Sequence, residues 1–225
     1  MTQDVRTIAV IGCGVIGIGW AILFISCGLK VIISDPAEGA HKSLKRYLKQ
    51  SRSYFEERGD FNKLSSNYEF IFDIMTRLPE VDFVQENGPE RVKFKQSLIE
   101  RLDENARPGV IIASSSSGLP SSAFIQKYKK DPSRILIGHP FNPPHLIPLV
   151  KVIPHPNTSP KSISSTLAFY RSLGKKPILL HQEVPDFVSN HLQAAINNEA
   201  YSLISRGIMS AKDLNIAITQ GPGLR

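Results

Sequence analysis

The N-terminal part of the chain contains a segment of 23 residues, from Thr7 to Leu29, that has no charged side chain. A segment of this length could span a bilayer as one helix, so a membrane protein is the first alternative to weigh. Five glycines interrupt the segment, and no two of them have the GxxxG spacing that pairs membrane helices. A signal peptide is disfavoured because Asp4 precedes the segment and no small-residue cleavage site is evident. We therefore predict no membrane span.

The same segment is better explained as a strand, a glycine turn and a helix. A β-branched run from Thr7 to Ile11 predicts the strand, and a helix is expected from about Val15 to Cys27. Between them lies the pattern G-x-G-x-x-G, which in this position is typical of dinucleotide binding. Its glycines allow, in order, a tight turn, close approach of a pyrophosphate and close packing of the helix on the sheet. The predicted pyrophosphate-binding residues are Gly12, Gly14, Val15, Ile16 and Gly17.

A second predicted strand begins at Lys30 and ends in Asp35. Asp35 follows Gly17 by 18 residues (35 − 17), which is about the spacing at which a carboxylate meets a ribose 2′-hydroxyl. This spacing favours NAD over NADP. We therefore predict NAD as the cofactor, bound by the glycine turn and Asp35.

Further along the chain, helical and strand-like patterns alternate. This alternation predicts a Rossmann-type α/β fold with a doubly wound, mostly parallel sheet. Helices are expected at 40–58, from 89, at 121–130 and at 159–173, and strands at 68–72, 81–85, 110–113, 135–137, 149–153 and 177–180. From Pro185 onward the pattern is all-helical, and Ser210 to Asp213 resembles a capping box. We expect an NAD-binding domain over residues 1–184 and part of a helical domain over residues 185–225.

The composition indicates an ordinary globular chain, because 41% of the 225 residues are hydrophobic and 21% are charged. The net charge of +7 comes from Lys and Arg residues spread over several segments, which indicates a mild preference for anionic ligands rather than for nucleic acid. The two cysteines, Cys13 and Cys27, form neither a disulfide framework nor a metal-binding pattern. We therefore expect no metal, no nucleic-acid partner and a reducing, cytoplasmic location.

Two loops that follow predicted strands carry polar side chains at the sheet edge where Rossmann folds bind ligands. They are Ser114 to Gly118 and Gly138 to His145. Taken alone, the serines are explained as a solvated, helix-capping turn, and His139 as a structural imidazole. On an NAD-binding sheet, however, His139 becomes a candidate for the group that takes the proton of an alcohol, since histidine titrates near neutrality.

Three sequence motifs extend the pattern beyond the glycine turn. They are QENGPE at 85–90, SSSSGL at 114–119 and HPFNPPHLIPLV at 139–150. Together they resemble the 3-hydroxyacyl-CoA dehydrogenase family, and the lambda-crystallin branch with its L-gulonate 3-dehydrogenases in particular. The resemblance implies NAD-dependent oxidation of a 3-hydroxyl group, in a small anionic hydroxy acid of the L-gulonate type or in a 3-hydroxyacyl compound. It also implies that the C-terminal helices bind substrate and form a homodimer.

The same resemblance implies roles for individual residues. His139 matches the catalytic base of the family, and Ser117 and Asn190 match substrate-binding positions. The cofactor-pocket positions are matched by Glu90, Lys95 and Asn142. Without the resemblance, Glu90 and Lys95 are equally well explained as an ordinary ion pair on a helix surface.

The chain departs from the family pattern in three places. Lys151 replaces a Glu that orients the catalytic imidazole, and a cation there would lower the pKa of His139. In the long helix, Asp186 replaces Gly and His191 replaces Arg. Asp186 could supply the missing carboxylate, although stabilisation of the helix N-terminus is its default role. The chain ends at Arg225, inside a motif where relatives continue, so we expect an incomplete dimer interface.

Two functions are therefore open from the sequence. The first is an NAD-dependent oxidoreductase, with its activity reduced by the change at position 151. The second is a protein of the same fold that binds NAD with little or no catalysis. A Lys151→Glu variant separates them, because the substitution would raise the rate of an impaired enzyme.

Overall fold

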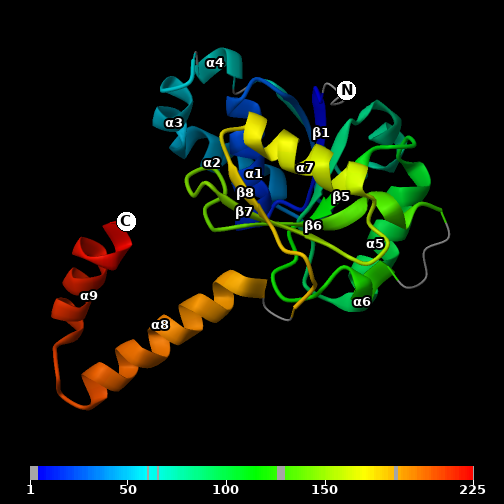
Figure 1. Cartoon of the computed structure of the whole chain (residues 1–225). Helices are drawn as coiled ribbons and strands as arrows, with labels where there is room; N and C mark the ends of the chain where they lie inside the picture. The colour runs from blue at the N-terminus through cyan, green and yellow to red at the C-terminus, as the bar shows by residue number, and fades with distance from the viewer. Residues whose placement is uncertain (1–4, 60, 65, 126–129, 185–186, 225) are drawn as a thin grey trace. The chain divides into compact units, whose positions relative to one another are not determined.

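The computed structural model of the chain describes residues 5–59, 61–64, 66–125, 130–184 and 187–224 (Figure 1). The chain divides into two compact units, Met1–Glu183 and Val184–Arg225. The first contains the sheet and its helices, and the second contains two helices.

The described part of the first unit forms one eight-stranded sheet, in the order β3-β2-β1-β4-β5-β6-β7-β8. Its strands are β1 (Thr7–Ile11), β2 (Lys30–Ser34), β3 (Tyr68–Ile71), β4 (Phe83–Glu86), β5 (Ile111–Ser114), β6 (Ile135–Pro140), β7 (Leu149–Pro154) and β8 (Lys176–Leu179). Neighbouring strands are parallel except β6 and β7, which pair antiparallel. The predicted Rossmann-type, mostly parallel fold is confirmed. Its strand order reverses direction between β1 and β4, which is where such sheets bind their ligands.

Helices cover both faces of the sheet (Figure 1). They are α1 (Val15–Ser26), α2 (Ala40–Gln50), α3 (Arg52–Glu56), α4 (Phe61–Leu64), α5 (Val92–Asn105), α6 (Ser122–Ile125) and α7 (Pro160–Ser172), with 3₁₀ turns at Met75–Glu80 and Pro132–Arg134. Apolar side chains of α1, α2 and α7 form one core with Ile8 and Val10 of β1. The right-handed crossover from β4 to β5 runs in the other direction along the sheet and therefore places α5 on the opposite face.

Stacked aromatic rings join α1 and α7 in the core. The Trp20 ring lies 5.3 Å from that of Phe24 and 5.4 Å from that of Tyr170, measured between ring centroids. Phe169 lies 6.0 Å from Phe24 and 4.4 Å from Phe83 of β4. Rings of this size bury much apolar surface, so the two helices are held together over the middle of the sheet.

Three expected helices differ from the structure. The helix expected over 40–58 breaks at Ser51 into α2 and α3, and Leu48 and Phe55, on either side of the break, are both buried in the core. The helix expected from 89 begins at Val92, and its N-cap, Arg91, has an extended backbone with φ −131° and ψ 121°. In the described part of the helix expected at 121–130, Ser122–Ile125 is helical and Ser121 and Lys130 are not, whereas residues 126–129 lie outside the described residues.

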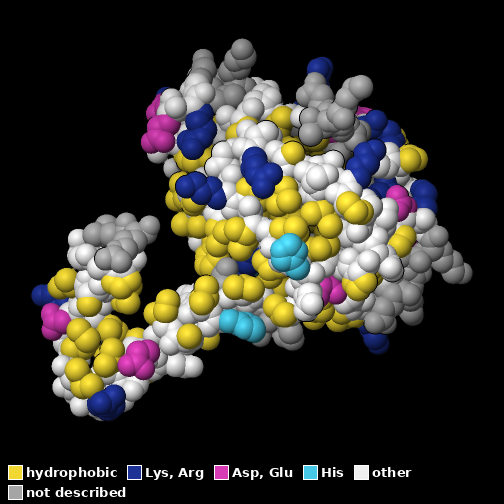
Figure 2. All heavy atoms as spheres, in the orientation of Figure 1, with side chains coloured by type: hydrophobic (Ala, Val, Ile, Leu, Met, Phe, Trp, Pro, Cys, Tyr) yellow, Lys and Arg dark blue, Asp and Glu magenta, His cyan; other side chains and the backbone are white. Residues whose placement is uncertain are grey.

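The second unit contains α8 (Phe187–Ser205) and α9 (Ala211–Gln220), followed by a 3₁₀ turn at Pro222–Leu224. As the sequence predicts, Ser210 caps α9, since its Oγ accepts a hydrogen bond of 3.1 Å from the backbone N–H of Asp213. Along α8, Val188, Leu192 and Ile196 recur every four residues and are all exposed. Figure 2 shows hydrophobic side chains along the surface of this helix. None of the described helices is both long enough and apolar enough to cross a membrane.

Candidate active site

The glycine turn joins β1 to α1 through backbone positions that a larger residue could not occupy. Gly12 has φ +92°, and a Cβ there would lie 2.8 Å from the carbonyl oxygen of Asn87. A Cβ on Gly17 would lie 1.9 Å from the carbonyl oxygen of Gly12. Both glycines are therefore needed to bring the first turn of α1 against the end of β1.

Gly14 has a different environment. A Cβ placed on it would meet no described atom within 4 Å, so its missing side chain leaves open space at the start of α1. In the described part of the chain, no side chain caps α1 at Gly14 and its first turn contains no acidic residue. The partial positive charge at the N-terminus of α1 therefore faces that open space. The side chain of Val15, in the first turn of α1, is exposed. This arrangement fits the pyrophosphate of NAD, which the sequence places here.

Asp35 lies beside the glycine turn, one strand away. Its Oδ2 accepts a hydrogen bond of 2.6 Å from the backbone N–H of Cys13, and its Oδ1 accepts one of 2.8 Å from that of Ala37. These bonds fix the carboxylate at the end of β2 and leave each oxygen with further capacity to accept. The position fits an acceptor for a ribose hydroxyl at the edge of the pyrophosphate site.

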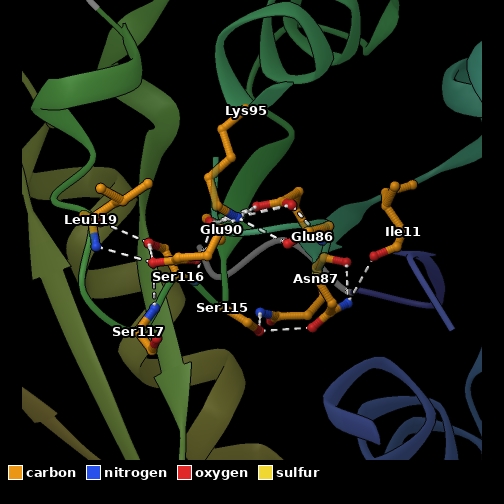
Figure 3. A network of polar contacts seen from close by, with 12 residues as sticks. Ile11, Glu86, Asn87, Glu90, Lys95, Ser115, Ser116, Ser117 and Leu119 are labelled. Atoms are coloured by element: carbon orange, nitrogen blue, oxygen red, sulfur yellow. Dashed lines mark hydrogen bonds and ion pairs between the residues drawn. The ribbon is translucent and has the colours of Figure 1, made fainter. Parts of the chain in front are cut away.

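Glu90 holds the loop that follows β5 (Figure 3). Its Oε1 accepts hydrogen bonds from the hydroxyl of Ser116 at 2.6 Å and from the backbone N–H groups of Ser117, Gly118 and Leu119 at 3.0 Å each. Burial raises the pKa of Glu90, but the bonds from Ser116, Gly118 and Leu119 outweigh it and hold the pKa below the usual value of a glutamate. A negative charge thereby shapes the loop that carries the exposed Ser117.

Lys95 forms a buried ion pair with Glu86 at the end of β4. The Nζ atom lies 2.9 Å and 3.1 Å from the two carboxylate oxygens, and both side chains are at most 1% exposed. Lys95 also lies 3.7 Å from Oε2 of Glu90, and the hydroxyl of Ser114 donates to Glu86. The explanation of Glu90 and Lys95 as an ion pair on a helix surface is therefore wrong, because Glu90 precedes the helix and Lys95 is buried.

Three residues of this network were missed by sequence reasoning: Glu86, Asn87 and Ser116. Glu86 and Asn87 carried a usable signal, since they are polar residues at the end of an apolar strand, next to a glycine. Ser116 lies within a run of four serines, so the sequence could not distinguish its hydroxyl, which bonds Glu90, from that of Ser117.

His139 lies on β6 opposite Lys151 of β7 in the antiparallel ladder, so both side chains project from the same face of the sheet. Burial, and to a lesser extent the charge of Lys151, lower the pKa of His139 to about 4, although the charge of Glu90 opposes them. Lys151 itself is fully buried, its Nζ lies 5.0 Å from the centre of the Phe141 ring, and burial lowers its pKa to about 8. At pH 7 the imidazole of His139 is therefore neutral and able to accept a proton.

The remaining predicted residues lie on the loop after β6 and in the helical unit. Asn142 is exposed on the loop after β6. The same loop is held by Lys175, whose Nζ donates hydrogen bonds to the carbonyl oxygens of Pro144 and Ile147. Asn190 is half-buried in α8 of the second unit. Asp186 lies outside the described residues.

Two groups of predicted residues thus lie at the carboxyl edge of the sheet. The glycine turn contacts Asp35 in the first group, and Glu90 contacts Lys95 and Ser117 in the second. His139 is close enough to this second group for the charge of Glu90 to affect its pKa. Among the described residues, no group of three or more His, Cys, Asp or Glu side chains could hold a metal ion.

Comparison with known proteins gives consistent matches. Residues 7–184 match the family model described as 3-hydroxyacyl-CoA dehydrogenase, NAD binding domain. The chain is 70% identical over 225 residues to a 3-hydroxyacyl-CoA dehydrogenase of Gibberella moniliformis, covering 100% of this chain and 70% of the relative. It is 38% identical over 224 residues to an L-carnitine dehydrogenase of Streptomyces coelicolor, covering 99% and 70%.

A solved structure agrees with these sequence matches. The crystal structure of 5-formyl-3-hydroxy-2-methylpyridine 4-carboxylic acid 5-dehydrogenase, an NAD⁺-dependent dismutase, superimposes with a TM-score of 0.85. The two sequences are 29% identical, and the match covers 98% of this chain and 72% of that one.

Proposed function

The chain belongs to the 3-hydroxyacyl-CoA dehydrogenase family, and we propose that it oxidises the 3-hydroxyl group of a small hydroxy acid or a 3-hydroxyacyl compound, with NAD as the cofactor. The observation that carries this proposal is the environment of His139. Its imidazole lies near the carboxyl end of β6, and its lowered pKa keeps it neutral at pH 7. A neutral imidazole at this edge of the sheet can accept a proton, although its lowered pKa makes it a weaker base than an ordinary histidine.

In the proposed reaction, His139 accepts the proton of the substrate hydroxyl while the hydrogen on the same carbon leaves as a hydride, and the C–O bond becomes a carbonyl. NAD, when bound, supplies the ring that accepts this hydride. The open space at Gly14 and the carboxylate of Asp35 support cofactor binding. Ser117 and Asn190 are proposed to orient the substrate oxygen, and Asn142 to lie beside the nicotinamide.

Glu90 and Lys95 are proposed to shape the cofactor pocket indirectly. Four hydrogen bonds to Glu90 set the conformation of the loop that carries Ser117. Lys95 holds Glu86 and Glu90 together and so connects this loop to the end of β4. In this proposal Glu90 and Lys95 affect the binding of cofactor and substrate by fixing the position of the loop that carries Ser117.

The substrate is proposed by its chemistry. Relatives of this chain include L-carnitine dehydrogenases and a 3-hydroxyacyl-CoA dehydrogenase, and the HPFNPPHLIPLV motif resembles L-gulonate 3-dehydrogenases. The substrates that these enzyme names imply are L-carnitine, L-gulonate and a 3-hydroxyacyl-CoA. Each carries a carboxylate or phosphates, and each has a hydroxyl at the third carbon. A net charge of +7 suits such anionic groups.

We propose that residues 1–184 form the NAD-binding domain and that residues 185–225 contribute to substrate binding and dimerisation. The exposed Val188, Leu192 and Ile196 of α8 are proposed as an apolar surface for a homodimer. A cytoplasmic location is proposed on the cysteine content alone.

A second candidate is a protein of the same fold that binds NAD with little or no catalysis. The observation that favours it is the buried Lys151 next to His139, because its positive charge disfavours the imidazolium formed during the reaction.

One experiment separates the two candidates. The wild-type chain and Lys151→Glu are assayed for NADH formation with L-carnitine, L-gulonate, 3-hydroxybutyrate and a 3-hydroxyacyl-CoA, and calorimetry measures NAD binding in parallel. The enzyme proposal expects NADH with at least one substrate and a higher rate for Lys151→Glu. NAD binding without turnover in either protein would instead support the second candidate.

A further inference from the structure

A buried polar network on the α1/α7 face of the sheet connects the strand of the proposed base to the glycine turn. It consists of Trp20, Gln85, Asn87, Ser115 and Tyr170, with backbone groups of Ile11 and Gly138. None of these side chains has a role in the proposed reaction, although Trp20, Gln85 and Tyr170 are fully buried. Buried polar groups are costly unless satisfied, so a network of this kind calls for an explanation.

Gln85 is the centre of the network. Its Oε1 accepts a hydrogen bond of 2.7 Å from the hydroxyl of Tyr170, and its Nε2 donates to Oγ of Ser115 at 2.9 Å and to the carbonyl oxygen of Gly138 at 3.3 Å. To reach β6 from β4, the side chain crosses β5 at Ala113, its direct partner in the ladder. A small residue at this position leaves room for that crossing.

There is no room for a side chain at position 138. A Cβ on Gly138 would lie 2.1 Å from the hydroxyl oxygen of Tyr170 and 3.2 Å from Cβ of Ala113. Pairing between β5 and β6 ends at Ser114 and Ile137, one residue before Gly138. Gln85 therefore attaches β6 to the sheet just beyond the last paired residue. The next residue along β6 is His139.

The other half of the network reaches the glycine turn (Figure 3). Ser115 accepts from Nε1 of Trp20 at 3.1 Å and donates to Oδ1 of Asn87 at 2.7 Å. Asn87 in turn donates from Nδ2 to the carbonyl oxygen of Ile11 at 3.1 Å, directly before Gly12. With two bonds accepted and one donated, the hydroxyl of Ser115 has its full complement.

We propose that Gln85 and Tyr170 are positioning residues that fix the distance between the strand of His139 and the cofactor-binding glycine turn. This inference rests on the proposed function. Hydride and proton transfer require the base, the substrate and the cofactor in one geometry, and a displacement of about 1 Å can cost as much as about 100-fold in rate. A continuous set of directional bonds from Gly138 to Ile11 fixes this spacing more closely than apolar packing would.

The test compares Tyr170→Phe and Gln85→Met with Thr166→Val. Thr166 is fully buried on the same helix as Tyr170, and its hydroxyl bonds the backbone of Ser162, outside the network. At a temperature where all variants are folded, Tyr170→Phe and Gln85→Met should lower kcat by about 10-fold with little change in the Kd for NAD, whereas Thr166→Val should retain the wild-type kcat. If the three variants have equal kcat values after each is divided by the fraction of protein that is folded, the proposal is overturned.

A second pair of variants covers the case in which Gln85→Met does not fold. Gly138→Ala should lower kcat strongly, because the new methyl group collides with the hydroxyl of Tyr170. Adding Tyr170→Phe removes that hydroxyl and should restore part of the rate, although it lowers the rate in the wild-type background. If Tyr170→Phe lowers kcat in both backgrounds, the proposed contact does not position His139.

A measurement without turnover separates this inference from the proposed function. In protein labelled at histidine, the NMR signal of His139 is assigned by its loss in His139→Gln and compared among the variants. We expect it to move in Tyr170→Phe and Gln85→Met and to stay in Thr166→Val, with the signal of the exposed His181 constant in all. Absence of turnover in the wild type would reject the proposed function. Independently, a His139 signal that does not move in Tyr170→Phe and Gln85→Met would reject the positioning role.

Discussion

Two buried lysines near the carboxyl edge of the sheet have different surroundings. Lys95 lies between the carboxylates of Glu86 and Glu90, with one oxygen of Glu86 at 2.9 Å. Lys151 lies over the ring of Phe141 and across the ladder from His139, and burial lowers its pKa to about 8. The comparison shows two uses of a buried cation. One neutralises carboxylates and holds loops in place, whereas the other acts on the protonation of a neighbouring imidazole.

The largest expected effect concerns the imidazole that faces Lys151. His139→Gln should lower kcat/KM by about 100-fold to 10,000-fold, since it removes the proposed general base. NAD binding should stay within about 3-fold of wild type, because the glycine turn is untouched. Steady-state kinetics and calorimetry check this result, with His181→Gln, an exposed histidine, as the control. Retained activity in His139→Gln would remove the basis of the mechanism.

Truncating each lysine in turn tests the comparison directly. Lys95→Met should destabilise the fold by about 3–5 kcal/mol, because it leaves Glu86 charged and buried without its cation. Lys151→Met should cost less than about 1 kcal/mol or be stabilising, since a methionine fills a similar volume without a buried charge. Denaturant unfolding at pH 7 measures both values. Equal losses would show that the two lysines have the same structural role.

The pH dependence of the reaction tests the effect of Lys151 on His139. With the pKa of His139 lowered to about 4, the base remains deprotonated at mildly acidic pH, and kcat/KM should fall only as the pH drops toward about 4. Removing the cation in Lys151→Met raises the pKa of His139, so the acid limb should move to higher pH. A limb that stays in place in Lys151→Met would show that burial alone sets the pKa.

A small effect is expected from a change in the loop held by Glu90. Glu90→Gln keeps an oxygen for the three backbone N–H groups but loses its charge, and should destabilise the fold by about 1 kcal/mol. Because folding lowers the pKa of Glu90, its contribution is present above the pKa of the unfolded state and is lost as the pH falls through the folded-state value. The difference between wild type and Glu90→Gln should therefore shrink in acid, as unfolding curves at several pH values would show.

The sequence predicted the local structure best where the residues concerned are close along the chain. The glycine turn and Asp35 lie within one strand–helix–strand unit, so their spacing alone indicated a nucleotide site, and the fold class was confirmed by the strand order. The region around Glu90 was predicted less well. A helix pattern starting at residue 89 did not reveal that Glu90 would instead bond a loop 26 to 29 residues away.

Local patterns determined the alternation of strands and helices, the glycine turn and the polar loops, because periodicity and backbone conformation depend on near neighbours. Only the tertiary structure decided that Lys95 would meet Glu86 and that Tyr170 would bond Gln85, 85 residues away. The strengths of buried ion pairs and the shifts of buried pKa values depend on desolvation and on partners brought together by folding.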